Sequence, residues 1–217
     1  VSLNNFDFVV APEHDGLEGI NVLKSKGAIH YLTEAELLEN TNYLKPQIKK
    51  KKVIVFIAGG PNKYYDFNDK IIEKIFIKTK KNFINQGYQL IFIPSMRTPR
   101  RIVDKAQDFF DDDQIIISDI DKKAYLSALS LADHIIVTCD STSMISEAAM
   151  TGRPIYVAQM PSIKKNIRFQ KFFELFKSLD IIKNLENKVE EWSYKKLNET
   201  HRISGYIEKQ FKDYDFS

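Results

Sequence analysis

Apolar runs of strand length alternate with helical patterns through the middle of the chain. Val53–Ala58 is continuously apolar and rich in β-branched residues, which is typical of a strand buried on both faces. Four similar runs follow, at Gln89–Ile93, Ile115–Ser118, His134–Thr138 and Pro154–Ala158. Helical patterns separate them, at 68–85, 99–110, 124–132 and 144–150. Since parallel strands need crossover connections, this alternation predicts an α/β protein with a Rossmann-like, doubly wound parallel sheet.

The segments on either side of the predicted sheet have a different pattern. Phe6–Val10 and Ala28–Leu32 are predicted to be strands, and Glu34–Asn42 is predicted to be a helix. Beyond Pro161 we expect mostly helix, at 168–178, 187–197 and 203–212. A first strand with no element before it favours a chain that begins inside a larger protein, although a processed protein would look the same. The two flanking strands would then lack sheet partners, and unpaired apolar strands associate with one another.

Composition narrows the class of protein. The 217 residues are 43% hydrophobic and 28% charged, and 32 Lys and Arg stand against 29 Asp and Glu, a net charge of +3. Nucleic-acid-binding proteins usually have a stronger basic bias, so we expect no nucleic-acid partner. No apolar run approaches the ~18 residues of a membrane span. The single cysteine, Cys139, rules out an internal disulfide and favours a reducing compartment such as the cytoplasm.

Three loops after predicted strands carry candidate chemistry, because ligands of open parallel sheets bind beyond the carboxyl ends of the strands. The first loop contains Gly59, Gly60 and Lys63. Two glycines let the backbone approach a ligand closely, and Lys63 could contact a phosphate. The same pair would also form a tight turn from strand to helix. The loop matches neither the dinucleotide-binding fingerprint nor the P-loop.

The second loop is basic. Arg97, Arg100 and Arg101 cluster at the predicted start of a helix, where the helix dipole disfavours cations. An anion bound between Arg97 and the helix N-terminus would remove that conflict. A solvated basic turn is the alternative.

The third loop is the strongest candidate for a ligand site. Ser141, Thr142 and Ser143 place three hydroxyls at a helix start, and Glu147 lies four residues after Ser143 on the same helix face. Hydroxyls and free amides suit phosphate oxygens, and a carboxylate suits a pair of ribose hydroxyls. The alternative is an ordinary helix capped by Asp140 or Ser141, although three hydroxyls exceed what capping needs.

Other candidates are weaker. Cys139 would lie about 16 Å along a strand from His134, too far for that histidine to activate it as a nucleophile. The four histidines, at 14, 30, 134 and 201, do not have the spacing of a zinc site. The run Lys49–Lys52 could contact anionic lipid, although a solvated linker is the simpler interpretation.

Several segments together resemble the mitochondrial-fission ELM-type proteins, a family of bacteria and plants. Two motifs of the resemblance are fairly specific, His14-Asp15 and Asp140–Ala148. Cys139, just before the second motif, stands where a small residue is expected. Further matches are Phe6–Gly16, Asn21–Leu23, Gly27–His30, Gly59–Pro61, Arg97–Pro99, Trp192, Tyr194, Leu197 and Glu199–Thr200. The resemblance covers nearly the whole chain. It implies a fold similar to GT-B glycosyltransferases, in which two Rossmann-like domains face a cleft.

This resemblance implies a division of the chain into three parts. Residues 1–45 would be the remnant of an N-terminal domain with a linker helix, and most of that domain would be missing. Residues 46–165 would be a Rossmann-like nucleotide-binding domain, the C-terminal domain of the GT-B-like fold. Residues 166–217 would be helices that pack back toward the N-terminal domain.

The resemblance also implies a function, a nucleotide-sugar-binding, glycosyltransferase-like protein. Ser141–Ser143 and Gly60 would hold the diphosphate, Glu147 would hold the ribose, and Arg97 or Lys63 would neutralise the leaving diphosphate. The nucleotide diphosphate-sugar is a substrate, so we expect no cofactor. Because GT-B enzymes generally need no bound metal, the resemblance also implies that none is held. The partners would be this donor, the missing N-terminal domain and a peripheral contact with the inner membrane. The alternative is a non-catalytic adaptor that binds a protein or membrane partner through the same fold.

A transferase also needs a base for the acceptor hydroxyl, and His14 and Asp15 are the candidates. They follow the predicted strand Phe6–Val10 and its exit, Ala11-Pro12, so they would lie beyond a carboxyl strand end that faces the cleft. A histidine oriented by a carboxylate can serve as such a base. The alternative is a plain turn, because Asp15-Gly16 is a common turn pair.

Overall fold

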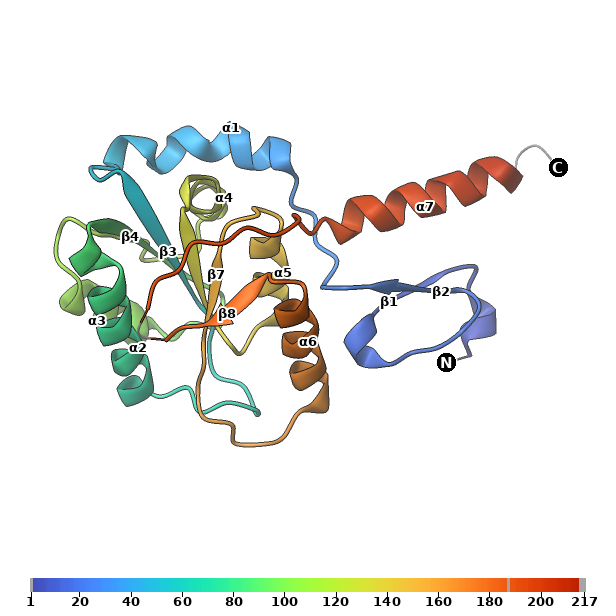
Figure 1. The fold of residues 1–217 in the computed structure, drawn as a ribbon, viewed down its shortest axis with the longest axis horizontal. Helices are drawn as coiled ribbons and strands as arrows, with labels where there is room; N and C mark the ends of the chain where they lie inside the picture. Colours follow the sequence, from blue (N-terminus) through green and yellow to red (C-terminus); the bar gives the residue numbers. More distant parts are fainter. Residues whose placement is uncertain (1, 187, 215–217) are drawn as a thin grey trace.

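A computed structural model of the chain describes residues 2–186 and 188–214. Its larger sheet has six parallel strands in the order β5-β4-β3-β6-β7-β8 (Figure 1). These strands are β3 (Lys52–Ala58), β4 (Tyr88–Pro94), β5 (Ile115–Ile116), β6 (His134–Thr138), β7 (Ile155–Ala158) and β8 (Ile182–Asn184). The predicted parallel, doubly wound α/β sheet is therefore confirmed.

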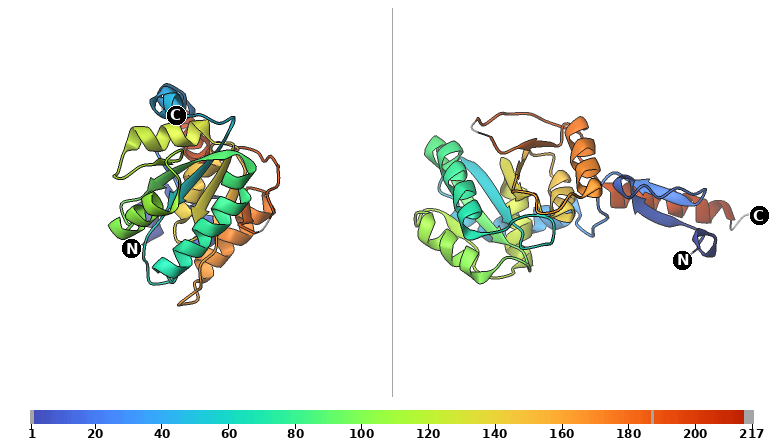
Figure 2. Two further views of the ribbon diagram at one scale, coloured as in Figure 1. Left: turned by 90° about the vertical axis from the view of Figure 1, so that its left-hand side faces the viewer. Right: turned by 90° about the horizontal axis from the view of Figure 1, so that it is seen from below.

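Helices lie on both faces of the larger sheet (Figure 2). They are α1 (Glu34–Leu44), α2 (Asp69–Asn82), α3 (Arg100–Phe109), α4 (Lys122–Leu131), α5 (Thr142–Ala149) and α6 (Ile167–Ser178), whereas α7 (Glu199–Tyr214) projects away from the sheet. Side-chain oxygens satisfy free amides at several helix starts: Asn68 caps α2, Asp121 caps α4 and Ser141 caps α5. The central strands bury both faces, as their continuous apolar pattern predicts: in β3, residues 53–58 are all buried.

The strand order places a topological switch point between β3 and β6. From β3 the chain moves outward through β4 to β5, and it then returns to the other side of β3 to form β6, β7 and β8. The loops after β3 and β6 therefore diverge at their carboxyl ends, where open α/β sheets form a ligand crevice.

The N-terminal segment differs from its prediction. Strand β1 (Val9–Pro12) overlaps the predicted strand only at its end, and it pairs in parallel with β2 (Val22–Ser25), which the pattern did not indicate. The expectation that the flanking strands lack sheet partners is therefore wrong for β1. Ala28–Leu32 is not a strand, because side chains rather than a neighbouring strand satisfy its amides. The Ala28 amide donates to Ser146 Oγ (2.9 Å).

The β1–β2 pair and α7 extend together away from the larger sheet (Figures 1 and 2). Glu199, at the start of α7, accepts a hydrogen bond from the Lys26 amide at 2.8 Å. The His30 amide donates to Thr200 Oγ1 at 3.1 Å, and Arg202 donates to the Lys24 carbonyl at 2.6 Å. The beginning and the end of the described chain are thus joined through α7.

The C-terminal segment also needs correction. The sequence pattern predicted only helices within residues 166–217. The structure also has the three-residue strand β8 there, which the pattern missed. Of the predicted helix at 187–197, residue 187 lies outside the described residues and 188–197 are not helical. Side chains hold that stretch against the sheet instead: Trp192 Nε1 donates to the Asp180 carbonyl (2.8 Å) and the Tyr194 hydroxyl to the Arg153 carbonyl (2.8 Å). The division into domains stays a prediction.

Candidate functional site

One buried carboxylate ties together the loops at the switch point. The Asp140 side chain is fully buried, and its Oδ2 accepts hydrogen bonds from the Gly60 amide (3.0 Å) and the Arg97 guanidinium (2.7 Å). Its Oδ1 accepts from the Thr138 hydroxyl (2.6 Å), whose oxygen accepts from the Gly59 amide (2.8 Å). We call these five residues the Asp140 cluster. Its charges and amides are satisfied within the protein.

Packing explains why the cluster contains two glycines. A Cβ on Gly59 would lie 2.2 Å from the Asp140 carboxylate, and a Cβ on Gly60 would lie 1.9 Å from the Arg97 carbonyl oxygen. Both distances are far inside van der Waals contact. The two glycines are thus required by close packing within the protein. They do not form the tight strand-to-helix turn that the sequence left as an alternative, because residues 59–68 separate β3 from α2. A contact of Gly59 or Gly60 with a phosphate stays a prediction.

The two predicted cationic groups have different surroundings. Arg97 pairs with Asp140, so an internal carboxylate neutralises it, although 42% of its side chain is exposed. The Lys63 side chain is exposed, and its ammonium lies 5.2 Å from the centre of the Tyr64 ring. The proposed contact of either residue with a diphosphate stays a prediction.

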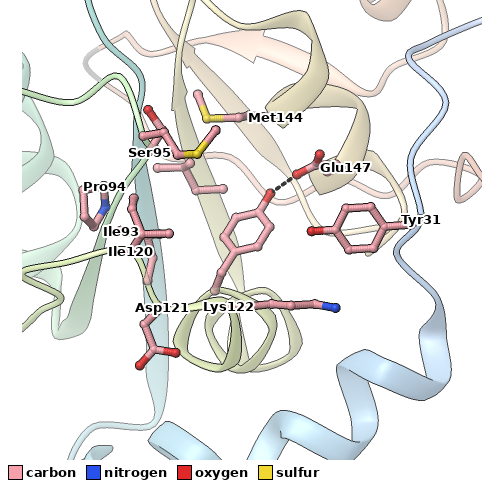
Figure 3. Close-up of a pocket in the computed structure, with 12 residues that line it drawn as sticks. Tyr31, Ile93, Pro94, Ser95, Ile120, Asp121, Lys122, Met144 and Glu147 are labelled. Atoms are coloured by element: carbon pink, nitrogen blue, oxygen red, sulfur yellow. Dashed lines mark hydrogen bonds between the residues drawn. The ribbon is translucent and has the colours of Figure 1, made fainter.

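A cavity of about 260 Å³ opens at the carboxyl ends of β3 and β4 (Figure 3). Its walls are mostly apolar and come from both strands, the loop after β4, α4 and α5. Tyr31 points toward it from the segment before α1 (Figure 3). The lining residues are Tyr31, Ile57, Ile93, Pro94, Ser95, Met96, Ile120, Asp121, Lys122, Tyr125, Met144 and Glu147.

Glu147 is the acidic group that this cavity receives from α5. The Tyr125 hydroxyl donates a hydrogen bond to Glu147 Oε2 at 2.6 Å (Figure 3). Burial raises the pKa of Glu147, and the hydrogen bond from Tyr125 opposes that shift. Burial also raises the pKa of Tyr125 well above its usual value, so the phenol remains a donor. Glu147 Oε1 accepts no hydrogen bond from the residues that the structure describes.

The N-terminus of α5 lies one helical turn before Glu147. Ser141 is its cap, since its Oγ accepts from the Met144 amide at 3.4 Å, and this is one of the two caps that the sequence left open. The amides of Thr142 and Ser143, the first two residues of the helix, donate to no acceptor in the described part of the chain. Ser143 is exposed. The contact of Ser141, Thr142 and Ser143 with phosphate stays a prediction.

His14 and Asp15 lie apart from this cavity. Both belong to a short 3-10 helix, 13–15, and Ala11 and Pro12 are part of β1 rather than its exit. His14 is buried with its ring edge-on to Phe172 of α6 (5.4 Å between ring centres), and burial lowers its pKa. Asp15 accepts a hydrogen bond from Arg168 Nε at 2.7 Å. Their catalytic role stays a prediction.

Sequence reasoning missed the partner of Glu147. Tyr125 is 22 positions earlier in the chain, on α4, and no local spacing connects the two residues.

Cys139 is buried, and burial raises the pKa of its thiol to about 12, which suits a packing residue. No group of three or more potential metal ligands occurs within residues 2–186 and 188–214. None of the helices that the structure describes is long and apolar enough to cross a bilayer.

Comparison with known proteins assigns the chain to a family. The sequence model of the family described as mitochondrial fission ELM1 matches residues 1–211. The chain belongs to the mitochondrial fission ELM1 family. The predicted resemblance is thus confirmed across nearly the whole sequence.

Two curated relatives are much longer than this chain. Uncharacterized protein RP120 of Rickettsia prowazekii (strain Madrid E) is 28% identical over 207 residues, which cover 92% of this chain and 58% of the relative. Mitochondrial fission protein ELM1 of Arabidopsis thaliana is 24% identical over 236 residues, 96% of this chain and 55% of the relative. The chain therefore spans a little over half the length of these relatives.

A solved structure with a similar fold is the UDP-GlcNAc 2-epimerase from Neisseria meningitidis bound to UDP-GlcNAc. It superimposes with a TM-score of 0.46 at 14% identity and covers 89% of this chain and 48% of that chain. The likeness concerns the fold alone.

Proposed function

We propose that the chain binds the nucleoside diphosphate part of a nucleotide sugar at the carboxyl edge of its larger sheet. The observation that carries the proposal is the Glu147 carboxyl group, held by Tyr125 in the wall of a cavity at the end of β3 and β4. A partly buried carboxyl group with a free oxygen suits the paired hydroxyls of a ribose.

The groups around Glu147 match the remaining parts of such a ligand. The free amides of Thr142 and Ser143 and the dipole of α5 favour phosphate oxygens one turn away from the ribose. The apolar walls, including Met96 and Ile120, suit the faces of a base. In this arrangement the Asp140 cluster shapes the crevice, and the ligand would contact the groups beside it.

Glycosyl transfer is the reaction that a donor bound in this way would serve. Lys63 and the exposed part of Arg97 would stabilise charge on the leaving diphosphate, and the proposal requires neither metal nor cofactor. A base for the acceptor would come from elsewhere, with His14 and Asp15 as the candidates on this chain. The longer relatives offer room for an opposing acceptor domain, so catalysis is a proposal for the whole protein.

The test is titration calorimetry of the chain with UDP, CDP, GDP and ADP. We expect at least one to bind and Glu147→Gln to weaken it by roughly ten- to hundredfold, because a hydrogen bond to a charged group is worth about 1.5–3 kcal/mol. Glu208→Gln, an exposed glutamate on α7, is the matched control and should change nothing. An affinity within twofold of wild type in Glu147→Gln would reject the ribose role. Failure of every nucleotide to bind would favour the adaptor alternative.

A second pair of variants isolates the helix amides. Thr142→Ala removes the hydroxyl alone, whereas Thr142→Pro also removes the amide N–H. Proline is tolerated at the first position of a helix, and Ser141 already has the extended backbone that precedes proline, so stability should change little. We expect the proline variant to bind the diphosphate more weakly than the alanine variant. Equal affinities would place the phosphates elsewhere.

A further inference from the structure

The loop between β7 and α6 forms a projection at the carboxyl edge of the larger sheet. It reaches further from the sheet than the neighbouring loops in two perpendicular views (Figures 1 and 2). Backbone hydrogen bonds hold it against the loop after β3: the Ile163 amide donates to the Tyr64 carbonyl (2.8 Å), and the Asp66 amide to the Pro161 carbonyl (2.9 Å). These bonds give the projection a defined shape.

Two aliphatic side chains are exposed on this projection without a packing reason. Ile163 is 65% exposed and Ile167, in the first turn of α6, is 60% exposed. The core side of α6 is already occupied, since Phe172 and Phe176 are fully buried. Ile167 therefore lies on the solvent side of α6, and Ile163 lies on the loop just before that helix.

Lysines surround the two isoleucines. Lys164 and Lys165 lie between them and are exposed, Lys171 is exposed one turn further along α6, and Lys63 is exposed on the loop that pairs with the projection. In the part of the chain that the structure describes, none of the four forms an ion pair, whereas Arg168 pairs with Asp15. We call Ile163, Lys164, Lys165 and Ile167 the α6 tip.

The lysine run Lys49–Lys52 is built differently. Lys49 pairs with Asp113 (2.9 Å) and Lys52 with Glu191 (3.4 Å), at the start of β3 on the opposite edge of the sheet. Ile48, the aliphatic residue beside this run, is partly buried and packs against the core. The linker interpretation of that run fits this geometry.

We infer that the α6 tip docks on an anionic lipid surface, with its lysines at the headgroups and its two isoleucines at the boundary with the acyl chains. Positive charge alone would fit any polyanion. The exposed isoleucines favour lipid, because interfacial binding combines apolar burial with attraction to anionic headgroups. The inference does not depend on nucleotide binding.

The test is co-sedimentation of the chain with phosphatidylcholine vesicles, with and without phosphatidylglycerol. We expect binding only to the anionic vesicles, and weaker binding at high salt. Each lysine near such a surface contributes roughly fivefold to partitioning, so Lys164→Gln with Lys165→Gln should weaken binding by about 25-fold. Lys50→Gln with Lys51→Gln is the matched charge control and should have little effect. An equal loss in both pairs would overturn the assignment to the tip.

A second pair of variants separates lipid from other polyanions. Ile163→Ser with Ile167→Ser keeps every charge and should weaken vesicle binding by roughly tenfold, through lost apolar burial. Melting temperatures should match wild type, because both side chains are exposed. If the isoleucine pair has no effect, the tip is a general polyanion site and the lipid assignment is wrong.

A labelled chain gives an independent readout. Cys139 is the only cysteine of the sequence and is fully buried, so an environment-sensitive dye on Ile163→Cys reports on the tip alone. We expect its emission to shift to the blue with anionic vesicles and not with heparin. A shift with neither, in a chain that retains nucleotide binding, would reject the docking surface and leave the proposed function intact.

Discussion

The two halves of the candidate site, the Asp140 cluster and the neighbouring cavity, differ in whether their polar groups are satisfied within the protein. In the Asp140 cluster the carboxylate accepts from the Gly60 amide, the Arg97 guanidinium and the Thr138 hydroxyl, and that hydroxyl accepts from the Gly59 amide. In the neighbouring cavity, Glu147 keeps one oxygen without a hydrogen bond from the described residues, and two amides of α5 have no acceptor there. The Asp140 cluster is therefore the closed half of the site, because its polar groups bind one another, and the cavity beside it is the open half. The groups suited to a ligand come from α5, supported by α4.

The largest expected effect is on the free energy of unfolding, through a change in the Asp140 cluster. Gly60→Ala places a methyl group 1.9 Å from the Arg97 carbonyl oxygen, so the backbone of one loop must move. We expect a loss of about 3 kcal/mol in the free energy of unfolding, measured by urea denaturation. Gly205→Ala is the control: its Cβ has nothing within 4 Å, and a helical alanine should add about 0.5–1 kcal/mol. Equal stabilities of the two variants would contradict the close approach.

Arg97→Ala should have a smaller effect. It leaves the buried Asp140 carboxylate without its cation, but Arg97 is 42% exposed, so water already screens part of the pairing. We expect a loss of about 1–2 kcal/mol, below the cost of breaking a fully buried pair. The double variant with Asp140→Asn should lose less than the sum of the single variants. Strict additivity would show that the pair contributes nothing.

The smallest expected effect has the opposite sign and concerns the open half. Because the folded-state pKa of Glu147 is raised, folding favours its protonated form. That contribution is fully present below the unfolded pKa and is lost as pH rises through the folded pKa. Glu147→Gln removes this pH dependence, so at neutral pH the variant should be at least as stable as wild type while binding nucleotide more weakly.

Urea denaturation at about pH 4 and about pH 7 would check this expectation. The free energy of unfolding of wild type, relative to that of Glu147→Gln, should decrease from about pH 4 to about pH 7. If Glu147→Gln is less stable than wild type at about pH 7 but not at about pH 4, the ionised carboxylate stabilises the fold. The contrast between a closed and an open half would then be wrong.

The sequence predicted the central sheet well because its strands are long, apolar and buried on both faces. His134–Thr138 was predicted with its correct bounds, and the helices beside it were close. The missed strands β2 and β8 are short, and neither differs clearly in composition from a loop. The prediction of a helix over 188–197 was wrong. Hydrogen bonds such as that from Trp192 to the Asp180 carbonyl take the place of helical hydrogen bonds there, and apolar periodicity cannot reveal them.

The candidate site shows the same limit. The motif at 140–148 indicated where polar groups gather, and Glu147 does lie in a cavity wall. The motif could not show that Asp140 binds Gly60 and Arg97, because these contacts join residues 80 and 43 positions apart. The sequence could not predict the hydrogen bond from Tyr125 to Glu147 for a similar reason, because the two residues lie 22 positions apart. Local pattern therefore locates a site of this kind, whereas the partners of each group depend on the three-dimensional fold.

The joining of β2 to α7 has a consequence for how the chain is made. The bonds between Lys26 and Glu199, His30 and Thr200, and Lys24 and Arg202 link residues 170 to 178 positions apart. At the usual pace of translation, on the order of ten seconds or more pass between the synthesis of the β2 segment and that of α7. Over that interval Phe8, which later packs against Tyr206, has no helix to cover it. The segment around β2 is thus among the last parts of this chain to reach its final contacts, although it is synthesised well before α7.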